Sequence, residues 1–141
     1  MKKNRNNYRC HWHCVYNLKY HLVLVTKYRR KCFTEKILNR LKNLCEEQCR
    51  LWNIECLEFG GEEDHVHLML EMHPNIMPSK FINSLKTVTS RLLRKEFAQH
   101  FAKYYWKSGL WTRAYCLISA GGAPLSVLKE YIQNQGKSKE K

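Results

Sequence analysis

Hydrophobic and polar residues follow two different periods along the first part of the chain. Between Tyr16 and Leu24, apolar residues occupy every second position and most of the residues between them are polar, which is typical of a strand with one buried face. After Thr34, which can cap a helix, apolar residues recur every three or four positions as far as about Trp52. The pattern therefore predicts a strand followed by a helix.

The middle of the chain predicts two strands and a second helix. Residues 54–59 and 65–72 have the pattern of short strands, and Gly60 and Gly61 are expected to begin the tight turn between them. Residues 78–97 start with Pro78 and carry one apolar stripe among basic side chains. This pattern predicts an amphipathic helix.

The last part of the chain predicts a fourth strand over residues 115–119 and a third helix. Gly121 and Gly122 break the pattern, and the helix is expected to begin at Pro124 and to stop at Gly136. The whole order is β-α-β-β-α-β-α. The predicted class is therefore α+β, with a ferredoxin-like (RRM-like) β-α-β-β-α-β antiparallel sheet, two helices on one face and an added C-terminal helix.

Positive charge dominates the composition. Lys and Arg total 25 against 12 Asp and Glu, which gives a formal charge of +13, and residues 1–31 contain nine basic side chains and no acidic one. Such an excess attracts polyanions, nucleic acid above all. At 141 residues the chain fits one domain, expected over residues 15–141 after a basic arm at 1–14 that suits phosphate binding and solubility equally well.

Cysteine usage and hydropathy indicate the compartment. The seven cysteines are odd in number, and no apolar signal segment follows the basic start, so reduced thiols in the cytoplasm are expected. No apolar stretch approaches the ~18 residues that span a bilayer, so a membrane partner is not expected. The CHWHC run at residues 10–14 spaces its ligands too tightly for one tetrahedral ion, so we expect no zinc there.

Two histidines share one face of a predicted strand. The period of the 65–72 strand places His65 and His67 on one side and Val66 and Leu68 on the other. Two neutral imidazoles supply part of a metal site, and a catalytic cation needs a further protein ligand. Taken alone, such a pair more often only makes hydrogen bonds.

The predicted C-terminal helix carries a second pair of candidate residues. Tyr131 and Gln135 are four residues apart in YIQNQ, so a nucleophile and a carbonyl ligand lie on the same helical face. Considered separately, a core tyrosine and an exposed amide are the more common interpretations. A functional reading needs the two pairs of residues together.

Five segments of the chain form a recognisable set: YHLVLVTKYRRKCF (Tyr20 to Phe33), DHVHLML (Asp64 to Leu70), PSKFINSLKTVTSRLLRKEF (Pro78 to Phe97), LWTRAY (Leu110 to Tyr115) and GGAPLSVLKEYIQNQ (Gly121 to Gln135). Together they resemble the small single-strand transposases of bacterial insertion sequences, the IS200-like (TnpA-type) branch of the HUH superfamily. The resemblance runs from about Val15 to Gln135. Two positions of the basic helix depart from the family, because Thr87 stands for a common glycine and Thr89 for a common serine. We expect their effect to fall on DNA contacts.

The resemblance implies a specific activity and site. It implies that Tyr131 is the catalytic nucleophile, that His65, His67 and Gln135 bind Mg²⁺ or Mn²⁺, and that single-stranded DNA is cut and rejoined at hairpin-marked ends through a 5′-phosphotyrosine. It also implies a homodimer in which the histidines of one subunit face the tyrosine helix of the other. The residues expected to contact DNA are Lys27, Arg29, Arg30, Lys86, Arg91 and Arg94.

Other functions share parts of this pattern. A non-catalytic nucleic-acid module with a ferredoxin-like sheet is the main alternative, but its third strand would carry the aromatic residues of an RNA-recognition motif where this chain has HVHLML. Replication initiators and relaxases share the histidine pair, yet they usually place the tyrosine differently in longer chains. A host-adapted relative that acts on chromosomal palindromes also stays open.

Overall fold

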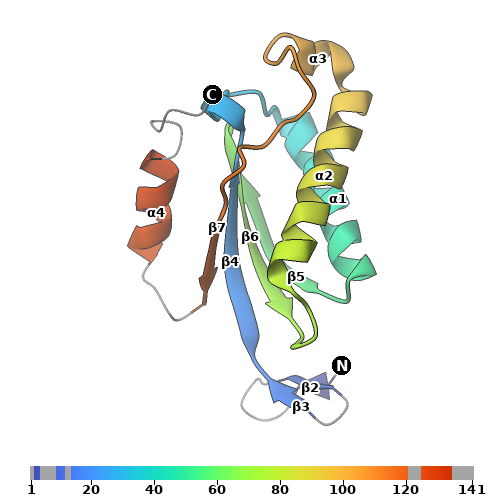
Figure 1. Ribbon diagram of the computed structural model, residues 1–141, viewed down its shortest axis with the longest axis vertical. Coiled ribbons are helices and arrows are strands. Elements are labelled where there is room, and N and C mark those ends of the chain that lie inside the picture. The colour runs from blue at the N-terminus through green and yellow to red at the C-terminus, as the bar shows by residue number, and fades with distance from the viewer. Residues whose placement is uncertain (1, 4–8, 12–13, 121–124, 135–141) are drawn as a thin grey trace.

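The centre of the fold is a four-stranded antiparallel sheet (Figure 1). The computed structural model describes residues 2–3, 9–11, 14–120 and 125–134. The strands lie in the order β5-β6-β4-β7. Their bounds are β4 (Leu18–Val25), β5 (Glu55–Gly61), β6 (His65–Met72) and β7 (Cys116–Ser119). This is the strand order of a ferredoxin-like sheet, so the predicted fold class is confirmed.

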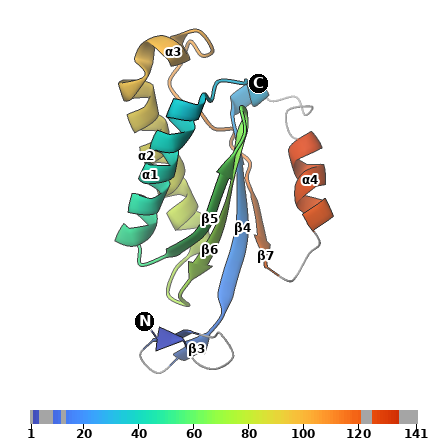
Figure 2. The ribbon, with the colours of Figure 1, turned by 180° about the vertical axis from the view of Figure 1, so that it is seen from behind.

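Helices cover the two faces of the sheet unequally. The long helices α1 (Glu35–Leu51) and α2 (Pro78–Glu96) pack side by side on one face, and α4 (Leu125–Asn134) lies on the other, as both views show (Figures 1 and 2). The short α3 (Ala98–Ala102) directly continues α2 and was not predicted. Among the described residues, no helix combines the length and the apolar character that crossing a membrane would require.

Local sequence signals explain where the long helices begin. The side chain of Thr34 accepts a hydrogen bond from the backbone N–H of Ile37 at 3.2 Å, which caps α1 as predicted. Pro78 occupies the first turn of α2, where its missing N–H costs nothing. A bidentate pair from Arg40 to Glu96 joins the two helices at their exposed surface.

The core lies between the sheet and the α1–α2 layer. Alternate residues of β4 and β6 point into it, and the apolar stripes of both helices meet them. The fully buried members with the largest volumes include Leu22, Leu24, Ile37, Leu41, Leu68, Leu70, Phe81 and Leu85. The opposite face of the sheet is therefore left for α4 and for polar side chains.

The prediction that a turn begins at Gly60 and Gly61 is wrong, because both glycines belong to β5. They pair with His67 and Val66 of β6, and the turn falls later, where Glu62 N donates to the His65 carbonyl at 2.9 Å. A Cβ at Gly61 would lie 2.7 Å from Leu38 Cδ2. The residue is thus glycine because α1 approaches the strand closely, not because the chain turns.

Short strands also occur before residue 18, in the segment expected to be a basic arm. β1 (Lys2–Lys3), β2 (Arg9–His11) and β3 (Cys14–Tyr16) form a small antiparallel sheet at the end of the molecule opposite α3 (Figure 1). The two-residue period predicted no strand here, because polar and charged residues dominate the segment. Parts of CHWHC, including His13, lie outside the described residues.

Candidate active site

The site is built on the face of the sheet that α1 and α2 leave uncovered. On β6, Val66, Leu68 and Leu70 are buried, while His65 and His67 point the other way and are half-buried. In register, His65 lies opposite Val25 and His67 opposite Val23 on β4, so these four side chains share one face. The strand period therefore predicts correctly that the two imidazoles lie together.

Helix α4 brings Tyr131 to this same face. Tyr131 and Ile132 pack against the buried pair Val23 and Val25, which lie directly opposite the histidines. Figure 2 shows α4 alone on this side of the sheet. The histidine pair and Tyr131 are more than 60 positions apart in the sequence, and they thus lie on the same face of the sheet. The predicted ligand Gln135, and the proposed helix ends at Pro124 and Gly136, lie outside the described residues.

A chain of hydrogen bonds connects α4 to His65. The Arg29 guanidinium donates through Nη1 to the Gln133 carbonyl at 3.0 Å and through Nε to Asp64 Oδ2 at 2.8 Å. The other oxygen of Asp64 lies 2.8 Å from His65 Nδ1. A carboxylate at Nδ1 fixes the ring and its tautomer, which leaves His65 Nε2 available to a metal.

Asp64 is held in its ionised form. Burial by itself would raise the pKa of the carboxyl, but hydrogen bonds from His65 and from Arg29, together with the positive charge of Arg29, lower it below its usual value. Asp64 is thus a permanent negative charge behind His65, which makes the imidazole a stronger ligand.

His67 contacts a third histidine. His21 Nδ1 lies 2.9 Å from His67 Nε2, and the two rings stack with centroids 5.1 Å apart. Burial lowers the pKa of His67, the positive charge that His21 can carry adds to this, and Glu58 opposes it. His67 is therefore neutral at pH 7, which is the form that binds metal, and a cation at Nε2 would replace the contact with His21.

These donors fit part of a divalent metal site. The described residues provide two neutral imidazoles on one face, and no group of three His, Cys, Asp or Glu among them is arranged to hold an ion. A cation at His65 and His67 therefore needs a donor of another kind, such as an amide oxygen, water or a phosphate oxygen.

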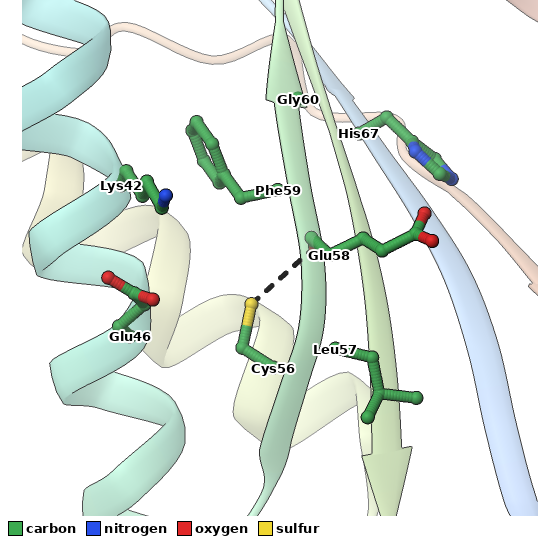
Figure 3. Close-up of a pocket in the computed structure, with 8 residues that line it drawn as sticks. All are labelled: Lys42, Glu46, Cys56, Leu57, Glu58, Phe59, Gly60 and His67. Carbon is green, nitrogen blue, oxygen red and sulfur yellow. Dashed lines mark hydrogen bonds between the residues drawn. The ribbon is translucent and has the colours of Figure 1, made fainter.

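A cavity of about 410 Å³ borders His67 at the edge strand β5 (Figure 3). In this view the Glu58 carboxylate extends toward the side of the sheet that carries the His67 ring, whereas Lys42 and Glu46 reach in from α1. His67 thus borders a cavity at the β5 edge of the sheet, which is lined by residues of α1, β5 and β6.

Most of the basic residues predicted to bind DNA line two neighbouring grooves. Two grooves, which share Ser108 as a wall, are lined by Lys27 and Arg30 in one and by Lys86, Arg91 and Arg94 in the other. The remaining candidate, Arg29, is engaged with Asp64 and Gln133 as described. The structure thus brings five of the six predicted residues together near residue 108.

Two of these cations hold the protein itself together. Lys86 Nζ donates to the carbonyls of Thr112 and Arg113 at 2.8 and 3.0 Å. Arg94 Nη1 donates to those of Lys107 and Gly109 at 3.0 and 2.7 Å. Both side chains therefore order the segment that follows α3, whereas Arg91 is exposed on the same helix.

Thr89 has a packing role instead of the expected effect on DNA contacts. It is fully buried, its hydroxyl donates to the Leu85 carbonyl at 2.7 Å, and it accepts a hydrogen bond from Trp111 Nε1 at 3.0 Å. Thr87 is exposed and bonds to the carbonyl of Asn83.

Sequence reasoning missed Asp64 and His21 as members of the site. Asp64 directly precedes the histidine pair, but it follows Glu62 and Glu63, and such an acidic run is typical of a solvated loop. His21 has the polar parity of its strand, so it could have been placed on the histidine face once β4 was paired with β6.

Comparison with known proteins gives a consistent result. A family pattern described as "Transposase IS200 like" matches residues 14–135. The chain is 30% identical over 123 residues to the transposase for insertion sequence element IS200 of Salmonella typhimurium, which is 87% of this chain and 80% of that protein. It is 27% identical over 121 residues to the ISDra2 transposase TnpA of Deinococcus radiodurans, 86% of each chain.

Solved structures agree with the sequence relatives. A transposase crystal structure from Deinococcus radiodurans R1 superposes with a TM-score of 0.80 at 28% identity and covers 96% of this chain and 98% of that one. A REP-associated tyrosine transposase bound to a REP hairpin has the same fold, with a TM-score of 0.55 at 11% identity over 95% of this chain and 73% of that one. The family pattern spans nearly the whole chain, and this protein therefore belongs to the IS200-like transposases, enzymes that move insertion sequences by cutting and rejoining DNA.

Proposed function

We propose that this transposase acts on single-stranded DNA at hairpin-marked element ends and forms a covalent 5′-phosphotyrosine with Tyr131. In this proposal Mg²⁺ or Mn²⁺ is held by His65, His67 and Gln135. The observation that carries it is the packing of Tyr131 against Val23 and Val25, on the sheet face where the two histidines lie.

The chemistry is a pair of opposite phosphoryl transfers. The Tyr131 oxygen attacks a backbone phosphorus, the bond from phosphorus to the 3′ oxygen breaks, and the leaving oxygen takes a proton to become a free 3′-OH. Attack of another 3′-OH on the phosphotyrosine re-forms a phosphodiester and releases the tyrosine. No ATP is needed, because the tyrosyl ester conserves the bond energy.

A phenol with an ordinary pKa of ~10 is a weak nucleophile at neutral pH, so the phosphate must be activated and positioned. A divalent cation, when bound, would supply this activation by polarising a phosphate oxygen. The chain supplies orientation, since Asp64 fixes the ring of His65 and Arg29 connects that carboxylate to the backbone of α4. This network aligns the helix that carries the nucleophile with the histidines.

Charge distribution supports single-stranded and hairpin DNA as the substrate. Lys27 and Arg30 line one of the two grooves around Ser108 and Arg91 lines the other, and Arg30 and Arg91 are exposed. The REP-associated transposase that shares this fold was solved on a hairpin. Phosphate contacts of this kind position DNA without reading its sequence.

The proposed active unit is a homodimer with composite sites. A single nucleophilic tyrosine per chain holds one cut end, and moving a segment requires two ends. In the single chain α4 lies on its own sheet, and the same surface of Val23, Val25 and Arg29 would receive the α4 of a second copy equally well. Gly121 and Gly122, which would form the hinge, lie outside the described residues.

The experiment that tests the proposed function is adduct formation on a denaturing gel. The purified protein is incubated with labelled hairpin DNA from the palindromes that flank its gene, with Mn²⁺ or with EDTA. We expect a slower-migrating protein–DNA adduct that requires the metal and is absent in Tyr131→Phe. Tight binding without any adduct would favour a non-catalytic module, and an adduct in Tyr131→Phe would show that another residue is the nucleophile.

A further inference from the structure

One of the two grooves that share Ser108 lies between η1 (Lys27–Arg29) and the segment that follows α3, at the same end of the molecule as His65. We call it the aromatic groove, with a volume of about 570 Å³, and define it by Lys27, Tyr28, Arg30, Lys103, Trp106 and Lys107. Its lining contains basic and aromatic side chains and no acidic one. This volume is in the range of sites that hold small molecules or parts of polymers, ~300–1,000 Å³.

Trp106 is fully exposed on a backbone that is firmly held. Its side chain is 100% accessible, although the flanking carbonyls of Tyr105 and Lys107 both accept hydrogen bonds from the Arg94 guanidinium. Tyr105 itself is buried, and its hydroxyl donates to the Lys27 carbonyl at 2.8 Å. The turn is thus anchored to α2 and η1, while its largest side chain contributes nothing to the core.

Tyr28 is also presented to solvent, and by a strained backbone. Its φ of 59° and that of Arg29, 52°, lie in the left-handed region, which two successive non-glycine residues rarely adopt. The Tyr28 side chain is 41% exposed, and the cations of Lys27 and Arg30 lie 5.6 and 5.7 Å from its ring centroid. Strained residues are held in place by the structure around them, and they cluster at functional sites.

We propose that the aromatic groove binds unpaired nucleotides of the single strand next to the cleaved phosphate. Bases stack on Trp106 and Tyr28, and phosphates contact the basic side chains around them. The neighbouring residue Arg29 belongs to the network of His65 and α4, so a strand leaving the catalytic face reaches this groove directly. The inference rests on the proposed action on single-stranded DNA, for which it adds a binding subsite.

Nucleic acid fits the groove better than a protein surface does. Every face of a base can stack on an exposed aromatic ring, and each phosphate needs a cation at its side. An interface between copies that paired this groove with itself would bring its four cations, Lys27, Arg30, Lys103 and Lys107, together. The combination of two exposed rings and four cations therefore favours a polyanion with aromatic bases.

The test measures the affinity of the full-length protein for a labelled oligonucleotide of 20 thymidines, which forms no hairpin. Stacking is worth ~1–3 kcal/mol per base, so we expect Trp106→Ala to weaken binding by about 5-fold or more and Trp106→Phe by far less. Tyr28→Ala and Tyr28→Phe form a second pair. Leu51→Ala removes another exposed apolar side chain, 66% accessible at the far end of α1, and serves as the matched control with no expected loss.

The outcomes separate this inference from the proposed function. If both alanine variants kept their affinity for the thymidine oligonucleotide and formed a normal Tyr131 adduct, the aromatic groove would not be a binding site for the single strand. The proposed transposase mechanism would be unaffected by this result. A stacking-dependent affinity without any adduct from element-end hairpins would contradict the proposed chemistry instead. If Trp106→Ala altered self-association in analytical ultracentrifugation and left thymidine binding unchanged, the surface would be a protein interface and the inference would be wrong.

Discussion

Asp64 has a structural role that its place in an acidic loop does not suggest. Its two carboxylate oxygens bind Arg29 and His65, so one side chain orients the proposed metal ligand and, through Arg29, connects it to α4. The same hydrogen bonds lower its pKa in the folded protein. This contribution to stability is present above the ordinary pKa of an aspartate and is lost as the pH falls through the lowered value.

Replacement of Asp64 by Asn is expected to weaken metal binding. The amide keeps the shape of the side chain but removes the charge behind His65, and loss of such a partner typically lowers metal affinity about 10–100-fold. Calorimetric titration of the DNA-free protein with Mn²⁺ measures the effect. Glu63→Gln, a change of the exposed neighbouring acid, is the control, and equal affinities of the two variants would show that Asp64 does not act through His65.

Arg91 and Arg94 lie on the same helix and line the same groove, yet their replacement is expected to affect different properties. Arg91→Ala should reduce DNA affinity and lower the salt slope by about 0.7 for a single strand, because an exposed cation neutralises one phosphate. Arg94→Ala should instead lower the free energy of unfolding by ~1–3 kcal/mol, because it leaves carbonyls of the 105–109 segment without their donor. Salt titrations of DNA binding and urea unfolding of each variant separate the two roles, and a large loss of stability in Arg91→Ala would contradict the assignment.

At the scale of the elements, close contact between α1 and β5 constrains the sequence more than local turn chemistry does. Gly61 lies under Leu38 of α1, whereas the adjacent Gly60 has open space around it. A double glycine before a polar loop normally indicates a turn, because glycine has the widest conformational freedom. Here the second glycine serves the packing of a helix on an edge strand.

Gly61→Ala should therefore destabilise the protein and Gly60→Ala should not. The new Cβ would lie 2.7 Å from Leu38 Cδ2 and 3.2 Å from Val66 Cγ1, and nothing lies within 4 Å at Gly60. Because the end of the leucine side chain can shift, we expect a loss near the lower end of the ~1–3 kcal/mol that overpacking costs. Thermal unfolding measures both variants, and equal melting temperatures would show that the helix moves away without cost.

At the scale of the whole molecule, the position of α4 decides whether Tyr131 and the histidine pair form one active site. Among the described residues, Tyr131 and Ile132 pack against the Val23–Val25 pair, and the Gln133 carbonyl accepts a hydrogen bond from Arg29. An interface on this surface is suited to exchange between copies, since each sheet offers the same surface.

Mixing two inactive variants tests the exchange. Under the proposed function, His65→Ala and Tyr131→Phe are each expected to abolish cleavage alone. In an equal mixture, about half of the dimers are heterodimers. If the sites are composite, each heterodimer keeps one intact site of its two, so cleavage should recover to about one quarter of the wild-type level. The measurement is adduct yield after co-refolding, with heterodimers confirmed by differently tagged subunits. No recovery would place each tyrosine beside the histidines of its own chain.

The sequence by itself determined the four strands of the central sheet, the helices α1, α2 and α4, and their order. Alternation in β4 and β6 and the apolar stripes of α1 and α2 arise from the burial of one face, and this periodicity can be read without knowing the partner. For the same reason the two-residue period placed His65 and His67 side by side, and resemblance to the family singled out Tyr131.

Only the tertiary structure decided which distant residues complete the site. The register of β4 against β6 brings His21 to His67, and the left-handed turn at Tyr28 and Arg29 directs the guanidinium to Asp64. The exposure of Trp106 likewise depends on how Arg94 and Tyr105 hold its turn. These contacts join segments far apart in the chain, and no local period carries information about them, because they depend on the packing of whole elements against one another.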